Sequence, residues 1–262
     1  MIRTPRRDGA TILRAKAAVL TGKQDAAVAA LAPLLGPHDP DSAPADRFLV
    51  DTALLWAAQR IRDHDAPHAA VQWCRYAHTT ATTLHGWQHP TALRAARLLA
   101  QVHTARGEHL EAYDAYSAVV AALCRTDLDG ACRAGAQADL AAHAAGRCSE
   151  AVAHLTAVWD SWQLDHDPTD RTGLFLLYRL TAMLAACGRR EEARRRFRDA
   201  EPALPPPGTP ARLGERRHAA AVLDDASRAH DLVCPHQRGA RYRRRSAPAA
   251  AVLPIDRAML LP

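Results

Sequence analysis

The sequence predicts an all-α protein made of stacked antiparallel helical hairpins, and three observations predict this class. Alanine, the residue with the highest intrinsic helix propensity, supplies 58 of the 262 residues. Valine, isoleucine, threonine and the aromatic residues never gather into the alternating runs, bounded by turn residues, that mark β-strands. A glycine–alanine pair recurs at intervals of 39 to 43 residues, and such self-similarity indicates a helical repeat.

This glycine–alanine pair marks the turn of each predicted hairpin. At the end of a helix, glycine adopts the left-handed backbone conformation that reverses the chain. An alanine five residues later allows the second helix to pack closely against the first. The five pairs, with aspartate replacing glycine in the second, are Gly22 and Ala27, Asp65 and Ala70, Gly107 and Ala112, Gly146 and Ala151, and Gly188 and Ala193.

Apolar residues at helical spacing support a hairpin at each turn. In the third copy, Tyr116 and Val119 follow Ala112 by four and seven positions, the pattern of a helix with one apolar face. The first helix of the fourth copy is the least regular, because Asp139 occupies a position that is small and apolar elsewhere. The same two positions of the other second helices hold Leu31 and Leu34, Cys74 and Ala77, Leu155 and Val158, and Phe197 and Ala200.

The pattern resembles the tetratricopeptide repeat (TPR) family, in the variety with a period near 42 that occurs in kinesin light chains and many bacterial proteins. The resemblance covers about residues 8 to 202. It is carried by the glycine–alanine pairs, by the apolar residue four positions later, and by "GWQHPTAL" at 86–93, which is similar to the family's Gly-x-x-His-Pro-x-Thr-Leu linker. Asp65, Asp139 and Thr181 depart from the pattern. The resemblance implies a right-handed superhelical solenoid that binds a protein or peptide in its concave groove, as an adaptor, scaffold or sensor.

The ends of the chain are predicted to differ from the repeats. We expect an N-terminal arm at 1–7, five hairpins at 8–203, a proline-rich break at 204–210, a capping helix at 211–232 and a flexible tail at 233–262. "LPPPGTP" cannot continue a helix, because a proline in a helix interior costs about 3 kcal/mol. Residues 211–230 regain helical spacing, and a terminal helix commonly covers the last apolar face of a repeat stack. The tail is basic and then proline-broken, which is typical of a loose end.

The sequence holds no catalytic or cofactor motif. G-x-S-x-G, H-E-x-x-H and the phosphate-binding loop are absent, so no enzyme, catalytic residue or cofactor is expected. The histidine pair His85 and His89, and the pair Cys234 and His236, lack the four-ligand spacing of zinc sites, so no metal site is expected either. A metalloenzyme with histidine and cysteine ligands is the least favoured alternative.

The cysteines and the apolar segments indicate a cytoplasmic protein. The six cysteines are scattered, without C-x-x-C, and most are expected to be small buried residues in a reducing environment, at positions 74, 124, 132, 148, 187 and 234. The N-terminal segment lacks the apolar core of a secretory signal, and no uninterrupted apolar run approaches the 18 or so residues of a membrane span.

The family resemblance implies that ligand-binding residues lie on the first helices and point away from the hairpin core. Arg94, Arg97 and Gln101 share one helix face, and arginines on such a face can bind the carboxylates of an acidic peptide. The alternative is an ordinary solvated face of an arginine-rich chain. The candidate groove residues are Lys16, Gln59, Arg62, Arg94, Arg97, Gln101, Arg133, His143, Phe175 and Tyr178.

Two further functions remain open at this point. The chain has a net charge of +6, and five arginines fall between residues 238 and 245, so the tail could contact nucleic acid or an anionic surface. No aromatic stacking platform accompanies these arginines, which makes nucleic acid the weaker alternative. The protein could also be the stand-alone sensor part of an ATPase signalling system. The sequence predicts neither the partner nor the oligomeric state.

Overall fold

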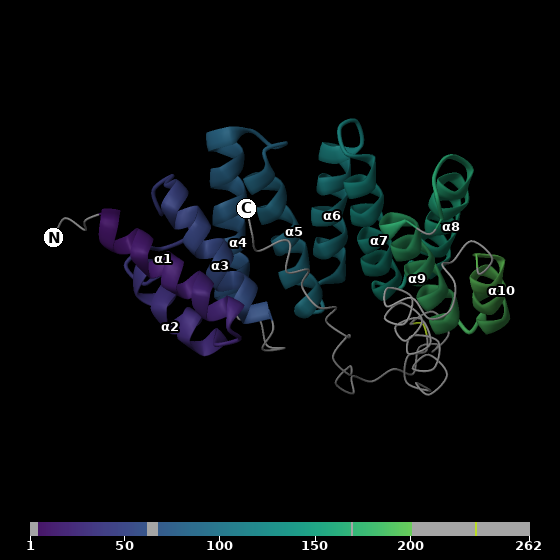
Figure 1. Cartoon of the computed structure of the whole chain (residues 1–262), viewed down its shortest axis with the longest axis horizontal. Coiled ribbons are helices and arrows are strands. Elements are labelled where there is room, and N and C mark those ends of the chain that lie inside the picture. Colours follow the sequence, from purple (N-terminus) through teal and green to yellow (C-terminus); the bar gives the residue numbers. More distant parts are fainter. Residues whose placement is uncertain (1–4, 62–67, 169, 201–233, 235–262) are drawn as a thin grey trace. The chain divides into compact units, whose positions relative to one another are not determined.

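The computed structural model describes residues 5–61, 68–168, 170–200 and 234, with side chains from residue 9 onward. These residues form ten α-helices and no strand, so the predicted all-α class is confirmed (Figure 1). The chain divides into two compact units, one ending at Ala122 and the other beginning at Leu123. The helices are α1 (Pro5–Leu20), α2 (Gln24–Leu35), α3 (Arg47–Arg60), α4 (His68–His85), α5 (Pro90–Ala105), α6 (His109–Leu123), α7 (Leu128–Ala144), α8 (Cys148–Asp165), α9 (Arg171–Ala186) and α10 (Arg190–Ala200).

Four of the predicted turns have the same hydrogen-bonded geometry. At the end of α5, Gly107 has a φ of 74°, and its N–H donates to the carbonyl of Thr104 at 3.0 Å. The next N–H, that of Glu108, donates to the carbonyl of His103 at 2.9 Å. This pair of bonds is the Schellman motif, which only a residue with positive φ completes. The same two bonds recur around Gly22, Gly146 and Gly188. The turn predicted at Asp65 lies outside the described residues.

The alanines that follow these turns are buried, as predicted. Their exposed fractions are 2% or less in every copy, so each lies where a larger side chain would force the two helices apart. The residue four positions later is buried in four copies and partly buried at Phe197. The five alanines are Ala27, Ala70, Ala112, Ala151 and Ala193.

The first helix of most hairpins begins with a side-chain cap. The carboxylates of Asp46, Asp127 and Asp170 accept hydrogen bonds from backbone N–H groups three residues later, at the starts of α3, α7 and α9. At α5, the cap is His89, whose Nδ1 accepts from the N–H of Thr91 at 3.2 Å. Proline follows His89 directly and tolerates the first helical position because its missing N–H has no partner there. The predicted helix start within "GWQHPTAL" is therefore confirmed.

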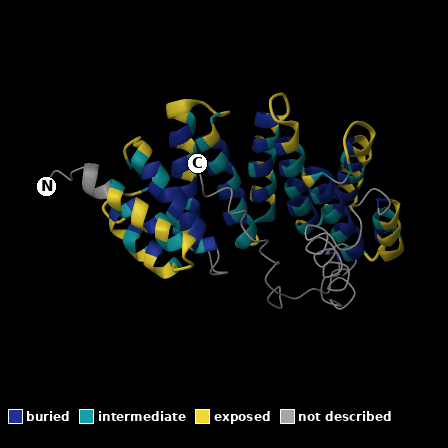
Figure 2. Cartoon of the chain, viewed as in Figure 1, coloured by how far each residue is buried: buried dark blue, intermediate teal, exposed yellow. Residues whose placement is uncertain are grey.

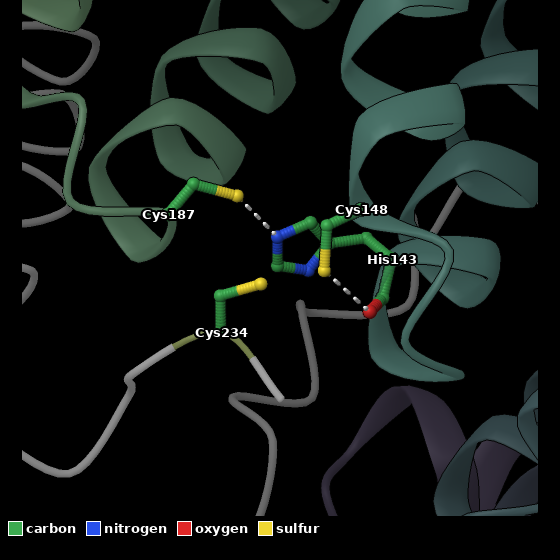
Figure 3. Close-up of side chains that lie close together, drawn as sticks. All are labelled: His143, Cys148, Cys187 and Cys234. Carbon is green, nitrogen blue, oxygen red and sulfur yellow. Dashed lines mark hydrogen bonds between the residues drawn. The ribbon is translucent and has the colours of Figure 1, made fainter. Parts of the chain in front are cut away.

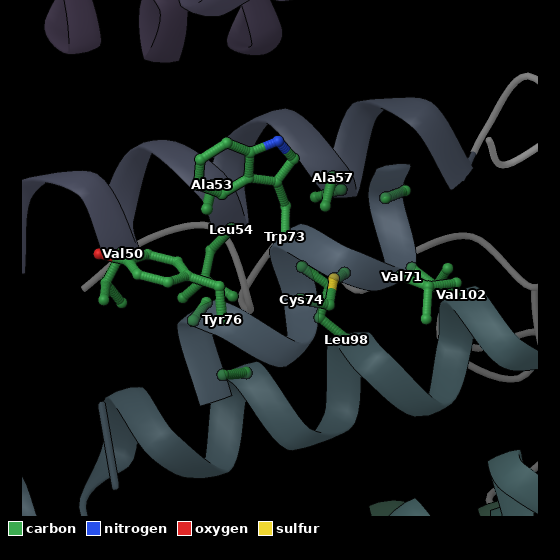
Figure 4. Close-up of a cluster of buried hydrophobic side chains, with 14 of the residues drawn as sticks. Val50, Ala53, Leu54, Ala57, Val71, Trp73, Cys74, Tyr76, Leu98 and Val102 are labelled. Carbon is green, nitrogen blue, oxygen red and sulfur yellow. The ribbon is translucent and has the colours of Figure 1, made fainter. Parts of the chain in front are cut away.

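The core of the first unit lies around α3, which is buried on two sides (Figure 2). One side packs with α4 and α5 through residues that include Leu54, Cys74 and Leu98 (Figure 4). Leu55, on the other side of α3, packs with the apolar residues of α1 and α2. A helix in the middle of a stack must be apolar on two sides, which is why α3 has almost no polar stripe.

Two aromatic residues of α4 anchor this core. The rings of Trp73 and Tyr76 meet edge to face, with centroids 5.5 Å apart, and both residues are buried (Figure 4). The Tyr76 hydroxyl donates to the carbonyl of Pro44 at 2.6 Å. This bond ties the segment before α3 to α4, since a buried tyrosine keeps its hydroxyl satisfied.

The predicted terminal segments are only partly covered by the structure. Helix α1 begins at Pro5, within the segment predicted as an N-terminal arm. The predicted break at 204–210, the capping helix at 211–232 and most of the tail lie outside the described residues. Cys234 is the exception: it is 2% exposed, and its N–H donates to the carbonyl of Ala186 at 3.0 Å. This hydrogen bond connects one residue of the predicted tail to the end of α9.

Candidate functional site

The candidate groove residues of the first unit fall into two groups. Lys16 on α1, together with Arg94, Arg97 and Gln101 on α5, is partly buried, so part of each side chain is accessible. Gln59 on α3 is only 1% exposed, and neither its Oε1 nor its Nε2 has a hydrogen-bond partner. Gln59 is therefore a core residue, contrary to the expectation that it faces a ligand. Arg62 lies outside the described residues.

Arg94 occupies a partly desolvated position next to the preceding first helix. Burial lowers the pKa of its guanidinium, because removal from water disfavours the charged form, whereas the nearby carboxylate of Asp51 on α3 raises it. Arg94 stays charged at neutral pH, since the ordinary pKa of arginine is so high. A ligand carboxylate at this position would compete with the Asp51 carboxylate for the Arg94 guanidinium.

In the second unit, three candidate residues are partly buried, and two of them make aromatic contacts. Arg133 on α7 and Phe175 on α9 are partly buried, and the guanidinium of Arg179 lies 4.9 Å from the centre of the Phe175 ring. The Tyr178 ring stacks on that of Phe197 on α10, with centroids 6.3 Å apart. Tyr178 therefore packs within its hairpin.

His143, at the end of α7, belongs to a cluster of potential metal ligands and does not face a ligand groove. His143, Cys148, Cys187 and Cys234 place one ligand atom each within 4.8 Å of all the others (Figure 3). The imidazole Nε2 of His143 lies 3.1 Å from the Sγ of Cys187. His143, Cys148 and Cys234 are buried, and Cys187 is partly buried.

Two consecutive hairpin turns and one downstream residue build this cluster. His143 and Cys148 flank the turn at Gly146, and Cys187 immediately precedes the turn at Gly188. Both turns have the same Schellman geometry, and α9 packs beside α7 and α8, so the two turns bring their side chains to the same end of the unit. The hydrogen bond from the Cys234 N–H to the Ala186 carbonyl then places the third thiol beside them.

Burial shifts the pKa values of two members of the cluster. It lowers the pKa of His143, which favours the neutral imidazole. Burial also raises the pKa of the Cys187 thiol, and the neighbouring thiols of Cys234 and Cys148 raise it further. The Cys148 thiol donates to the backbone carbonyl of His143 at 3.6 Å. A neutral imidazole and nearby thiols that lose their protons to a metal are what a soft cation requires.

Sequence reasoning missed this cluster because the spacing of its members matches no zinc motif. His143 and Cys148 are five positions apart, and Cys187 and Cys234 follow at 39 and 47 positions. The signal that could have revealed it is that Cys148 and Cys187 both lie within two residues of a repeat turn. His85 and His89, from which the sequence predicts no metal site, are not members of the cluster: His89 caps α5, and its ring centroid lies 4.4 Å from that of His85. His236, the sequence neighbour of Cys234, lies outside the described residues.

Asp139, which departs from the repeat pattern, is a buried carboxylate with a histidine partner. Its Oδ2 lies 2.8 Å from the Nδ1 of His154 on α8, and Asp139 is 5% exposed. Burial raises the pKa of Asp139, and His154 opposes this shift; the hydrogen bond to Asp139 raises the pKa of His154. The polar residue is tolerated in the apolar stripe because α8 supplies this partner.

Comparison with known proteins identifies the fold. No protein-family model matches the sequence, and no curated protein matches it either. Two crystal structures of nearly identical TPR-like repeats, attributed to a kinesin light chain of Podosopora anserina, are similar to this chain at 18% sequence identity. One, a point variant, has a TM-score of 0.66 and covers 78% of this chain and 97% of its own; the other has 0.65, 77% and 97%. The chain therefore has a TPR-like helical repeat fold.

No described helix combines the length and the apolar character that crossing a membrane requires.

Proposed function

We propose that the protein is a non-enzymatic interaction module that binds an acidic peptide segment of another protein. Five repeated helical hairpins with TPR-like architecture support this proposal. In such a fold the apolar residues pack each hairpin against its neighbours, and the first helices leave polar side chains accessible to a partner. The observation that carries it is the α5 face, where Arg94, Arg97 and Gln101 are all partly accessible. A cytoplasmic location is part of the proposal and is consistent with the absence of a disulfide among the six cysteines, all of them described residues.

The chemistry of the α5 face favours carboxylates. Arginine presents a planar fork of donors that matches a carboxylate in two parallel hydrogen bonds. Partial burial of Arg94 strengthens such a bond, since a charge in a less polar environment interacts more strongly. Asp51 offsets part of this attraction, so recognition requires a ligand with several acidic residues.

Charge reversal with a matched control tests the proposal. The probe is a fluorescent synthetic peptide rich in glutamate and aspartate, and its binding is measured by anisotropy. Reversing the candidate arginines to glutamate should weaken binding by roughly tenfold or more, since hydrogen bonds between charged groups each contribute about 1.5–3 kcal/mol. The variant carries Arg94→Glu and Arg97→Glu on α5, and the control carries Arg195→Glu and Arg198→Glu at exposed positions of α10.

The control separates a specific site from general attraction. Both double variants change the net charge equally, so a loss confined to the first supports the proposed face. An equal loss in both variants, or no loss in the first, contradicts it.

The competing function, contact with nucleic acid, is favoured only by the basic tail. Arginines in and next to α10 do not support it, because they bind acidic partners: Arg189, just before α10, binds Glu192, and within the helix Arg194 binds Glu191 and Arg196 binds Asp160 of α8. The arginines at 238–245 lie outside the described residues. Deletion of residues 238–262 should abolish any DNA binding that weakens steeply with salt, and should leave peptide binding unchanged.

A further inference from the structure

We propose that His143, Cys148, Cys187 and Cys234 form a structural zinc site, with the imidazole Nε2 and three thiolate Sγ atoms as ligands. The four ligand atoms lie within 4.8 Å of one another. The three cysteines are not among the candidate groove residues. His143 is one of those candidates, but its ring is directed at Cys187 (Figure 3).

The distances are close to those that a zinc ion imposes. Zn–S bonds of about 2.3 Å and Zn–N bonds of about 2.0 Å at tetrahedral angles place neighbouring ligand atoms about 3.6–3.8 Å apart. The Nε2–Sγ distance between His143 and Cys187 is 3.1 Å, and the widest separation in the cluster is at most 4.8 Å. Zinc binding therefore requires ligand atoms to move by about 1 Å or less, which small side-chain rotations supply.

The four donor atoms indicate which metal the site binds and whether the site is structural or catalytic. Thiolates and imidazole bind zinc well, whereas calcium and magnesium take oxygen ligands. Three cysteines and one histidine complete a tetrahedron, so no coordination position remains for a substrate or a water. The site is consequently structural and does not make the protein a metalloenzyme.

A disulfide explains the cluster less well than a metal. One bond would join two of the cysteines and leave the third thiol and the imidazole buried beside it. The three thiols and Nε2 instead converge on one point from three separate parts of the chain. One cation at that point can bind all four ligand atoms at once, whereas a disulfide uses two of them.

A zinc ion at this site would cross-link separate segments of the second unit. Cys234 follows Cys187 by 47 positions, and its N–H is bonded to the last residue of α9. A shared zinc ion would tie this point of the chain to the ends of α7 and α9 and to the start of α8. Closing a loop of that length by a metal removes conformational freedom from the unfolded chain and so favours the folded state.

Elemental analysis of the full-length protein, purified under reducing conditions, tests the site. We expect one zinc ion per chain in the wild type, and loss of stoichiometric zinc in Cys187→Ala and Cys234→Ser. Cys124→Ser is the matched control, because Cys124 is exposed and lies outside the cluster. After removal of zinc with a chelator, cobalt(II) should give the visible absorption of tetrahedral thiolate coordination in the wild type and in Cys124→Ser, and not in Cys234→Ser.

Cys234→Ser also separates loss of a ligand from loss of the fold. Cys234 is in none of the ten described helices, so the variant should keep the wild-type helical content by circular dichroism while losing the metal. Wild-type protein without zinc, zinc retained in both ligand variants, iron in place of zinc, or a disulfide within the cluster under reducing conditions would each overturn the proposal. The peptide-binding experiment is independent of all these outcomes.

Discussion

Replacing Gly107 with alanine tests the turn geometry on which the repeat depends. Gly107 has a φ of 74°, and a Cβ atom at this position would meet no heavy atom within 4 Å. Steric overlap with neighbours therefore contributes nothing, and the whole effect comes from the backbone conformation. The left-handed conformation costs an L-residue roughly 1–2 kcal/mol. We expect the free energy of unfolding to fall by this amount in Gly107→Ala.

Gly9→Ala provides a control with the opposite sign. Gly9 lies within α1, a Cβ atom there also meets nothing within 4 Å, and its φ is not positive. Alanine in a helix interior is more stable than glycine by roughly 0.5–1 kcal/mol, because glycine loses more conformational freedom on folding. The same substitution should therefore destabilise the protein at the turn and stabilise it in the helix.

The assay is urea unfolding followed by far-ultraviolet circular dichroism, with thermal unfolding as a second measurement. Each kcal/mol should change Tm by about 2–4 °C in a protein of this size. If Gly107→Ala is as stable as the wild type while Gly9→Ala gains stability, the assignment of the turn to a strained left-handed residue is refuted.

Two further predictions concern polar contacts of Tyr76 and Asp139, which are both buried. Tyr76→Phe removes the 2.6 Å hydrogen bond to the Pro44 carbonyl, and we expect a loss of about 0.5–1.5 kcal/mol in urea unfolding, the net contribution of a typical intramolecular hydrogen bond; an unchanged midpoint would contradict this. The hydrogen bond to Asp139 raises the pKa of His154 above 6.5, so its stabilising contribution is complete below about pH 6.5 and is lost as the pH rises through the higher folded-state pKa. Asp139→Asn should remove this decline, measured as the free energy of unfolding between about pH 5.5 and 8.5, and an unaltered pH dependence in the variant would disprove the coupling.

The hairpins could be predicted because their signals are local. Gly146 and Gly188 adopt positive φ because the hydrogen bonds of the turn require it. Pro90 starts α5 because the first helical position does not need an N–H donor. The alanine five positions after each turn is buried wherever the repeat places it. Such rules act over a few residues, so a single sequence is sufficient to find them.

The candidate site residues could be predicted only in part. Arg94 and Arg97, which were selected by their position on a first helix, are partly accessible, but the same criterion also selected Gln59, which is buried. Residues one turn apart on a helix differ in burial according to which side chains the neighbouring helices place against them. Tyr178 illustrates this, because its ring packs on Phe197 of the following helix.

The sequence by itself determined the helical class, the positions of the turns and the small residues where paired helices approach closely. These features follow from backbone conformation and side-chain size, which act between near neighbours. Only the tertiary structure decided that His143, Cys148, Cys187 and Cys234 meet. The local sequence at each turn and at Cys234 does not indicate which other segment lies beside it. Packing of consecutive hairpins brings equivalent turns together, and this long-range proximity has no counterpart in the spacing of residues along the chain.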